Sequence, residues 1–424
     1  MHILYLHQYF VPPDGAGGTR SYEFARRFVA RGHRVSLVTS SAFFPPSYAF
    51  DRRVSRLELD GIDIRVIRIP YSNRLGYARR MAAFAEFAMA CAGVASGLPR
   101  ADVVLATSTP LTIAFPGIVA KRRHRAPLVF EVRDLWPELP IAIGALKNPI
   151  AKWAARLLER VAYRASERIV ALSPGMKAGI EATGFPGERI HVIPNGCDLD
   201  LFGVPGQEAL FPAALRRDAG PIVMYAGTLG RINGVSYLVD IAAEVRDLAP
   251  DVRFVIAGDG AERERVVARA RETGTLGTTL FVLDPFPKHL MPRVLASATL
   301  ATSLFVDLPA MWNNSANKFF DALAAGAPVM INYSGWHADL LRQSGAGIAV
   351  PASDARGAAA ELLGLLRDPR RVARARAAAA RLARTRFDRD ELAERMCTVL
   401  EAAARRGNPE EETVGACRWT ACSS

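Results

Sequence analysis

The sequence has few cysteines, no long apolar run and no excess of acidic residues. None of its five cysteines forms a Cys-x-x-Cys pair, which argues against a zinc site or a disulfide framework and favours a reducing cytosol. No run of 18 apolar residues occurs, so we expect no transmembrane helix. The opening MHILYLHQYF lacks the features of a signal peptide and is typical of a first strand.

Basic residues outnumber acidic ones, 54 against 42, which gives a net charge of +12. Because the arginines are spread over most expected helices and no nucleic-acid-binding motif is present, we expect no nucleic-acid partner. The positive charge is consistent with a compositional bias toward arginine and alanine. It is also consistent with binding to an acidic membrane surface or to a phosphate-rich substrate.

Strand and helix patterns alternate along nearly the whole chain, which predicts an α/β protein with parallel sheets. HILYLH, GHRVSLVTS and APLVFEVRD belong to a first series, and PIVMYAGTLG, VRFVIAGDG and APVMINY belong to a second. We predict two doubly wound, Rossmann-like domains, residues 1–196 and 197–387, that face each other across a cleft. A helix over 388–406 returns toward the first domain, and 407–424 form a disordered tail.

Glycine-rich loops follow several of these strands. In PPDGAGGTR, Gly17 and Gly18 would let the backbone approach a ligand at the start of a helix, or would only form a tight turn. The dinucleotide fingerprint fails because Arg20 stands where its third glycine should be, so we expect no nicotinamide cofactor. The turn GDG in AGDGAERE places Gly260 in a similar strand-to-helix connection.

Charged residues accompany two further loops. In YAGTLGRINGVSYL, Gly227 and Gly230 flank a turn on which Arg231 could bind a diphosphate or remain solvated. In EVRDLWPE, Arg133 and Asp134 end a strand, where they either position an acceptor or pair with each other to hold the loop. The Asp-x-Asp of CDLD lies in the expected linker and is interpreted as a turn, so we assign no metal.

The segment NNSANKFFDALAAGAPVMINYSGW predicts a short helix with Ser315 as its N-cap. Asn317 and Asp321 are four residues apart and share a face, with Lys318 three residues before the carboxylate. An amide, an ammonium and a carboxylate grouped at the positive end of a helix are suited to a polyhydroxylated, phosphorylated ligand.

Taken together, these loops resemble the family-4 retaining glycosyltransferases, which have the GT-B fold. RIHVIPNGCDLDLF is similar to the interdomain segment of that family, and NKFFDALAAGAPV to the second half of its Glu-x7-Glu motif. RDLWPELPIAIGALKNP and NSANKFFDALAAG resemble bacterial O-antigen and capsule transferases, including those that add N-acetyl-L-fucosamine. The resemblance runs over nearly the whole chain.

The resemblance implies a nucleotide-sugar donor bound mainly by the C-terminal domain. Asp321 would accept hydrogen bonds from the ribose, and Asn313 stands where the family usually has a glutamate that contacts the sugar. The phosphate-binding arginine and lysine of the family fall near Thr228 and Asn233, both neutral here. We therefore expect other cations, Arg231 and Lys318, to stabilise the diphosphate, and a donor such as a UDP-linked N-acetylated or deoxy sugar.

The resemblance also implies front-face attack with retention and no cofactor, with Arg133 and Asp134 on the acceptor side. The acceptor would be a polyprenyl-diphosphate-linked saccharide, and the protein would be cytoplasmic, peripheral on the inner membrane. The apolar stretch 71–100, preceded by basic residues, could lie on anionic lipid or form an ordinary buried helix.

Two alternative functions remain at this stage. A nucleotide-sugar 2-epimerase shares the two-domain fold, and could recruit Asp134 and Glu138 as acid and base. A non-catalytic nucleotide-sugar-binding protein would be consistent with the neutral residues Asn313, Thr228 and Asn233. Formation of a product that requires an acceptor distinguishes the transferase from both.

Overall fold

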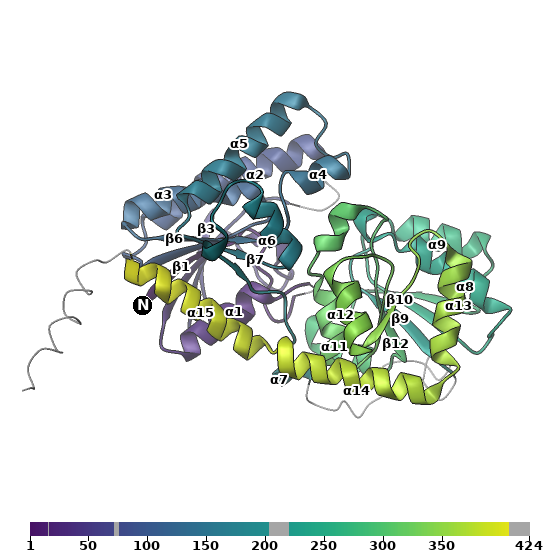
Figure 1. Ribbon diagram of the computed structural model, residues 1–424. Coiled ribbons are helices and arrows are strands. Elements are labelled where there is room, and N and C mark those ends of the chain that lie inside the picture. Colours follow the sequence, from purple (N-terminus) through teal and green to yellow (C-terminus); the bar gives the residue numbers. More distant parts are fainter. Residues whose placement is uncertain (16, 72–75, 203–219, 407–424) are drawn as a thin grey trace, which may run out of the picture.

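The structure, a computed structural model, describes residues 1–15, 17–71, 76–202 and 220–406. It contains two α/β domains, each built on a sheet with helices on both faces (Figure 1). The first sheet has eight strands in the order β3-β4-β2-β1-β5-β6-β7-β8, and the second has six in the order β11-β10-β9-β12-β13-β14. The prediction of two doubly wound domains is confirmed.

The strands of the N-terminal sheet are parallel except at one edge. They are β1 (His2–Leu6), β2 (Arg34–Ser40), β3 (Val54–Leu59), β4 (Ile62–Ile67), β5 (Val103–Thr107), β6 (Leu128–Val132), β7 (Arg168–Ala171) and β8 (Ile190–Val192). The edge strand β3, which pairs antiparallel with β4, was not predicted. Its turn residues Asp60 and Gly61 both have positive φ, 48° and 76°, which allows a tight hairpin.

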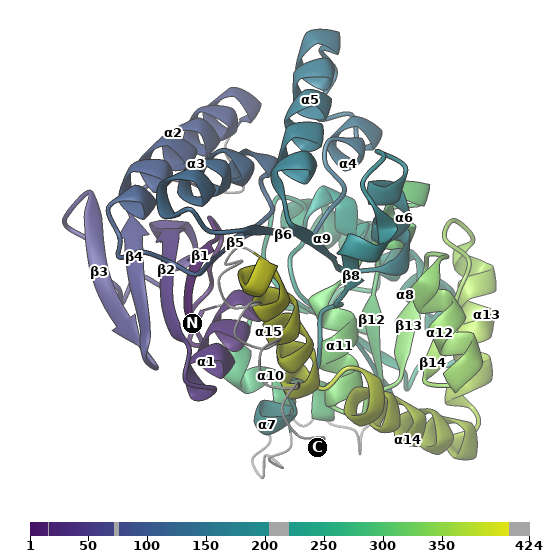
Figure 2. The ribbon, with the colours of Figure 1, turned by 60° about the vertical axis from the view of Figure 1, so that its left-hand side comes forward.

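Helices cover both faces of this sheet (Figure 2). They are α1 (Arg20–Ala30), α2 (Tyr77–Ser96), α3 (Ala114–His124), α4 (Glu138–Ala142), α5 (Pro149–Ala165) and α6 (Pro174–Glu181). Phe84 and Phe87 of α2 are 2% and 1% exposed and belong to the core with Cys91. Of the two alternatives for this stretch, burial therefore holds for Phe84 and Phe87, because the sheet already covers that face of α2. Arg74 lies outside the described residues.

The C-terminal sheet is entirely parallel. Its strands are β9 (Ile222–Ala226), β10 (Arg253–Ala257), β11 (Leu280–Leu283), β12 (Leu300–Ser303), β13 (Val329–Ile331) and β14 (Gly347–Ala349). Its helices are α7 (Leu199–Phe202), α8 (Ser236–Arg246), α9 (Arg263–Glu272), α10 (Met291–Ala296), α11 (Asn317–Ala324), α12 (Trp336–Ser344), α13 (Ala355–Leu366) and α14 (Pro369–Arg386). In the described part of the chain, no helix is both long and apolar enough to cross a membrane.

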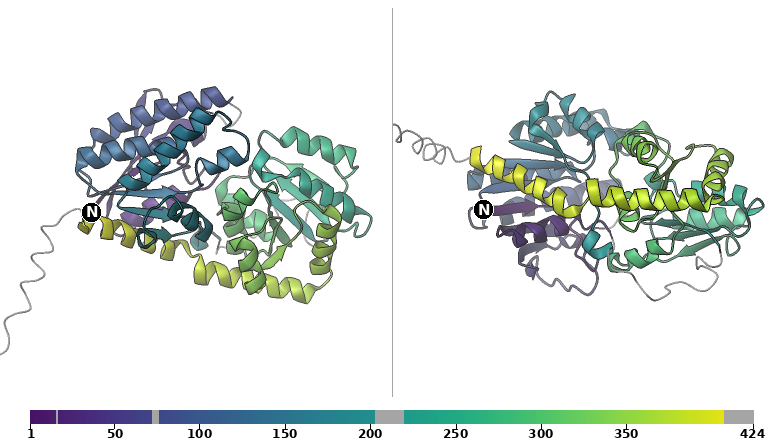
Figure 3. Two further views of the ribbon diagram at one scale, coloured as in Figure 1. Left: turned by 45° about the horizontal axis from the view of Figure 1, so that its top comes forward. Right: turned by 60° about the horizontal axis from the view of Figure 1, so that its bottom comes forward.

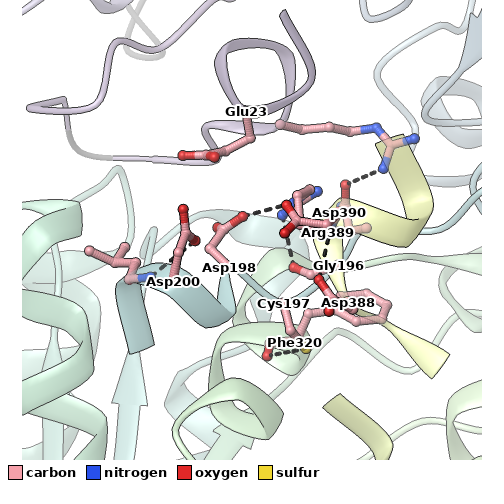
Figure 4. Close-up of polar contacts among 12 residues, drawn as sticks. Glu23, Gly196, Cys197, Asp198, Asp200, Phe320, Asp388, Arg389 and Asp390 are labelled. Atoms are coloured by element: carbon pink, nitrogen blue, oxygen red, sulfur yellow. Dashed lines mark hydrogen bonds and ion pairs between the residues drawn. The ribbon is translucent and has the colours of Figure 1, made fainter. Parts of the chain in front are cut away.

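The chain crosses between the domains twice, and the two crossings are hydrogen-bonded. The Cys197 N–H donates to Phe387 O over 2.7 Å, and the Arg389 N–H donates to Cys197 O over 3.0 Å. Helix α15 (Arg389–Arg406) then lies along the N-terminal domain, with Leu392 and Met396 in its core (Figure 3). The Arg389 guanidinium also donates to Asp198 Oδ1 and Gly196 O, both over 2.8 Å (Figure 4). Residues 407–424, expected to be disordered, lie outside the described residues.

Candidate active site at the domain junction

The segment after β12 lies against the N-terminal domain. The Ser173 hydroxyl, at the N-cap of α6, donates to Asn313 O over 2.6 Å. A Cβ placed on Gly175 would overlap the Asn313 side-chain amide, so these two residues are in direct contact across the domains. The carboxyl end of β12 is therefore joined to the loop that follows β7.

Ser315 serves this junction and does not cap α11. Its Oγ accepts from the Asn195 N–H over 3.1 Å, and its carbonyl accepts from the Asn195 side-chain amide. The N-cap is Ala316, whose N–H donates to Asn314 Oδ1 over 3.1 Å. The prediction of a Ser315 cap is thus wrong, because its hydroxyl is used by the other domain.

The glycine loop after β1 closes on the first turn of α11. A Cβ on Gly18 would overlap the side-chain amide of Asn317, so only glycine allows this approach without a shift. The neighbouring Gly17 has φ of 151°. The structure thus brings together residues from the first glycine loop and from the NKFFD segment, which are about 300 positions apart in the sequence.

Lys318 lies on the other side of this turn. Its Nζ is 5.2 Å from the centroid of the Tyr225 ring and 5.3 Å from that of the Phe305 ring. The ammonium therefore lies over one face of each ring. Gly227, with φ of 152°, permits the approach, since a Cβ there would be 3.2 Å from Lys318 Cε. Within the described ranges no acidic side chain pairs with this ammonium. Burial lowers the pKa of Lys318 to about 8.

Asp321, one turn later, has a different partner. Its Oδ1 accepts from Lys288 Nζ over 2.6 Å, and this ammonium is also 3.6 Å from Asp198 Oδ2. Burial raises the pKa of Asp321, and Lys288 offsets part of that effect. Burial lowers the pKa of Lys288, but the carboxylates of Asp321 and Asp198 raise it more. The three polar side chains at the start of α11 thus have three different partners within the protein.

In the glycine turn that follows β9, most contacts are within the turn itself or with neighbouring backbone. The Asn233 Oδ1 accepts from the Gly230 N–H over 3.3 Å, closing the turn at residues 231–233. Gly260 has φ of 154° and lies against the backbone of Leu229. The Arg231 side chain is 89% exposed, with its Nε 3.7 Å from Glu262 Oε1. Of the two cations expected at the diphosphate, Lys318 contacts the Gly227 turn, and Arg231 is largely exposed to solvent.

Arg133 and Asp134 follow β6 and have separate partners. Asp134 Oδ2 accepts from the Thr109 hydroxyl over 2.9 Å, while Arg133 Nη1 is 3.3 Å from His7 Nε2. Burial raises the pKa of Asp134, which the Thr109 hydrogen bond and Arg133 lower only in part. Burial, followed by the charge of Arg133, lowers the pKa of His7 well below its usual range.

Sequence reasoning missed Lys288 and His7 and left Arg20 unexplained. His7 directly follows β1, which is the one signal that could have marked it. Lys288 begins a single turn of 3-10 helix, residues 288–290, with no motif around it. Arg20 is fully buried, donates to Glu131 over 2.8 Å and also binds the carbonyls of Ile193 and Pro194. Arg20 therefore fixes the connection between β8 and the interdomain linker.

Both carboxylates of the Asp-x-Asp in the linker accept hydrogen bonds from arginines. Asp198 accepts from Arg389 (Figure 4), and Asp200 accepts from Arg26. Burial raises the pKa of Asp198, but Arg389 and Lys288 lower it more, to about 2. Among the described residues no group of three or more His, Cys, Asp or Glu side chains could hold a metal ion.

Comparison with known proteins assigns both halves of the chain. Residues 15–196 match the glycosyl transferase 4-like domain, and residues 220–368 match the glycosyl transferases group 1 domain. The chain has the two domains of a GT-B glycosyltransferase. HepE of Anabaena, solved with UDP and glucose, superposes on this glycosyltransferase fold with a TM-score of 0.68 at 18% identity, covering 95% of this chain and 100% of HepE. WaaG, described as involved in lipopolysaccharide biosynthesis, gives 0.65 at 16% identity, covering 94% and 99%.

Curated relatives of these glycosyltransferase domains differ in substrate. A GDP-mannose-dependent α-mannosyltransferase of Mycobacterium tuberculosis is 26% identical over 59% of this chain and 61% of its own length. A D-inositol 3-phosphate glycosyltransferase of Xylanimonas cellulosilytica is 30% identical over 57% of this chain. The chain spans about three fifths of the length of these two relatives. WbjE of Pseudomonas aeruginosa, a probable glycosyltransferase, is 24% identical over 50% of this chain and 53% of its own length.

Proposed function

We propose that the protein is a retaining glycosyltransferase that moves a sugar from a UDP-linked donor to a saccharide carried on a lipid diphosphate. The sugar is an N-acetylated or deoxy hexose, and the product enters a bacterial surface polysaccharide such as O-antigen or capsule. The group 1 domain over 220–368, the UDP-bound HepE structure and the likeness to WbjE and WaaG support this proposal. The protein would act in the cytoplasm, peripheral on the inner membrane.

The observation that carries the proposal is the ammonium of Lys318. It lies in the first turn of α11 and beside the Gly227 turn, over two aromatic rings and without a carboxylate partner in the described part of the chain. Removing a cation from water without a counterion costs free energy, which a bound diphosphate would offset. Lys318 thus replaces the cations that the family places near Thr228 and Asn233.

Other residues around the junction would orient the donor. Asp321 keeps 13% side-chain exposure beside its contact with Lys288, and in this proposal it accepts hydrogen bonds from the ribose. Asn313, Ser315 and Asn317 would surround the transferred sugar. The glycine turns at Gly17, Gly18, Gly227, Gly230 and Gly260 would keep the backbone close to the diphosphate.

The reaction follows from this arrangement. The acceptor hydroxyl oxygen bonds to the anomeric carbon on the face from which UDP departs, while the bond from that carbon to the phosphate oxygen breaks. The acceptor proton passes to the departing phosphate, so no protein base and no metal is needed. Lys318 stabilises the developing diphosphate charge, and Arg133 and Asp134 position the acceptor.

One observation favours a second function, a nucleotide-sugar-binding protein without catalysis. Asn233 closes its own turn and Asn313 contacts the N-terminal domain, so two positions that bind the donor in the family have other partners here. Binding of UDP-sugars without turnover in the presence of every acceptor would indicate this function.

The deciding experiment incubates the purified chain with UDP- and GDP-sugars, with and without a lipid-diphosphate N-acetylglucosamine acceptor. We expect one UDP-linked N-acetylated or deoxy sugar to be consumed only with acceptor, and EDTA to have no effect. Wild type should bind UDP more tightly than 2′-deoxy-UDP, whereas Asp321→Asn should not distinguish them. If UDP-glucose or GDP-mannose were the only donors turned over, the sugar assignment would be wrong. Isomerisation of a donor in the absence of acceptor would indicate an epimerase.

A further inference from the structure

Helix α5 has two apolar faces, and the described part of the chain covers only one of them. Leu158, Ala162 and Tyr163 pack into the core of the N-terminal domain. The opposite side carries large apolar side chains at spacings of three, four and four residues, which place them on one helix face. This α5 face consists of Ile150, Trp153, Leu157 and Val161, exposed by 75%, 65%, 46% and 43%.

The concentration of these side chains is unusual. Ten large apolar residues of the described chain are exposed, and four of them form the α5 face. Single exposed apolar residues are normal on soluble proteins, but a continuous patch marks a surface that contacts something apolar. Phe115, 48% exposed, lies in the first turn of α3, a helix that packs against α5.

The charges around the α5 face are positive. Residues 138–164 contain two acidic side chains, Glu138 and Glu159, of which Glu159 is 8% exposed and Glu138 pairs with Arg156 at 3.3 Å. The same stretch contains five basic residues: Lys147, Lys152, Arg156, Arg160 and Arg164. An apolar stripe flanked by arginine and lysine matches a surface with anionic headgroups above an apolar layer.

The position of α5 suits such a surface. The helix projects from the N-terminal domain, well clear of the C-terminal domain (Figure 2). Residues 133–148 connect its start to Arg133 and Asp134, and α4 within that connection contacts residues 309–313 of the other domain. The α5 face is thus joined by one short segment to the acceptor side of the domain junction.

We propose that the α5 face docks on an anionic lipid bilayer, with Trp153 and Leu157 inserted among the headgroups and the arginines at the phosphates. Its purpose rests on the proposed lipid-linked acceptor, because docking here would hold the junction next to a lipid-borne diphosphate. The docking itself is independent of transfer, and Phe84 and Phe87 of α2, which are buried, have no part in it.

The test is flotation of the full chain with vesicles of phosphatidylglycerol and phosphatidylethanolamine, against vesicles of phosphatidylcholine. Wild type should float with the anionic vesicles and less at high salt. Trp153→Ser/Leu157→Ser should lower the partition coefficient by about tenfold or more, since each side chain loses its apolar burial. Arg160→Glu/Arg164→Glu should lower it on anionic vesicles only. The matched control is Leu248→Ser, a change of a 61% exposed leucine on the C-terminal domain, which should leave flotation unchanged.

UDP binding by calorimetry, measured on every variant, reports folding and the donor site separately from docking. Wild type that binds UDP but stays with the soluble fraction at low salt overturns the docking proposal, as does an equal loss in Leu248→Ser. A dimer in sedimentation that Trp153→Ser/Leu157→Ser dissociates, without flotation, assigns the face to a second copy instead. Flotation without any sugar transfer leaves docking in place and removes the proposed function.

Discussion

Nζ of Lys288 lies 2.6 Å from Oδ1 of Asp321 and 3.6 Å from Oδ2 of Asp198. One buried ammonium therefore connects the helix that we assign to the donor with the segment that links the two domains. Asp198 in turn accepts from Arg389, at the start of the helix that returns to the N-terminal domain. Ionic contacts through Lys288 and Asp198 thus connect the donor helix to the interdomain linker and to Arg389.

Replacing Lys288 by Met should destabilise the protein strongly. The change leaves the Asp321 carboxylate buried without its cation, and breaking a buried pair in this way costs about 3–5 kcal/mol. The double variant Lys288→Met/Asp321→Asn should recover part of the loss because the uncompensated charge is gone. Melting temperatures of wild type, both single variants and the double variant measure the coupling, and additive losses would mean that the two side chains do not stabilise each other.

Binding of UDP should weaken as the pH rises through about 8. Burial lowers the pKa of Lys318 to about 8, so above that pH the free protein loses the cation that we assign to the diphosphate. Bound diphosphate stabilises the ammonium and raises its pKa. The affinity for UDP therefore falls with rising pH between the pKa of Lys318 in the free protein and its higher pKa in the complex. Calorimetry between pH 6.5 and 9.5 measures this, at constant ionic strength.

Lys318→Met should remove that pH dependence and lower turnover by roughly two to three orders of magnitude, as loss of a main charge stabiliser does. Arg231→Ala is the comparison, because its side chain is 89% exposed and should cost far less. An equal loss in the two variants, or a retained pH dependence in Lys318→Met, would contradict the assignment of the diphosphate to Lys318.

Gly18→Ala should lower kcat/KM for the donor by pushing the Asn317 amide out of its place. The effect acts through one side chain, so in an Asn317→Ala background the same glycine substitution should have little further effect. Kinetics of the two single variants and the double variant form the test. Independent losses would mean that the loop after β1 acts on the donor by another route.

The sequence predicted the fold because buried parallel strands are continuous apolar runs, as in APLVFEVRD and PIVMYAGTLG. It predicted less of the site. Asn317, Lys318 and Asp321 lie within the first five residues of α11, but their partners Gly18, Tyr225 and Lys288 come from three distant segments. Spacing along a helix indicates which side chains share a face, and it gives no information on what faces them. The hydroxyl of Ser315 was assigned to its own helix for the same reason.

Thr109→Val should move the acidic limb of the pH profile to higher pH. Burial raises the pKa of Asp134, and the Thr109 hydroxyl, which donates to the ionised carboxylate over 2.9 Å, lowers it in part. Without that hydrogen bond the pKa of Asp134 rises further, so an ionised Asp134 that positions the acceptor is lost at a higher pH than in wild type. The profile to measure is kcat/KM for the acceptor, which reports groups of the free enzyme.

Thr112→Val is the matched control for this change. It makes the same substitution three residues later, at a hydroxyl that is buried and has no hydrogen-bond partner in the described structure, so its acidic limb should coincide with that of wild type. A shift in Thr112→Val as large as in Thr109→Val would attribute the effect to packing around residues 109–113. An unchanged limb in both variants would remove Asp134 from the acceptor site, since a carboxylate that needs its charge there must respond to the loss of its only hydroxyl donor among the described residues.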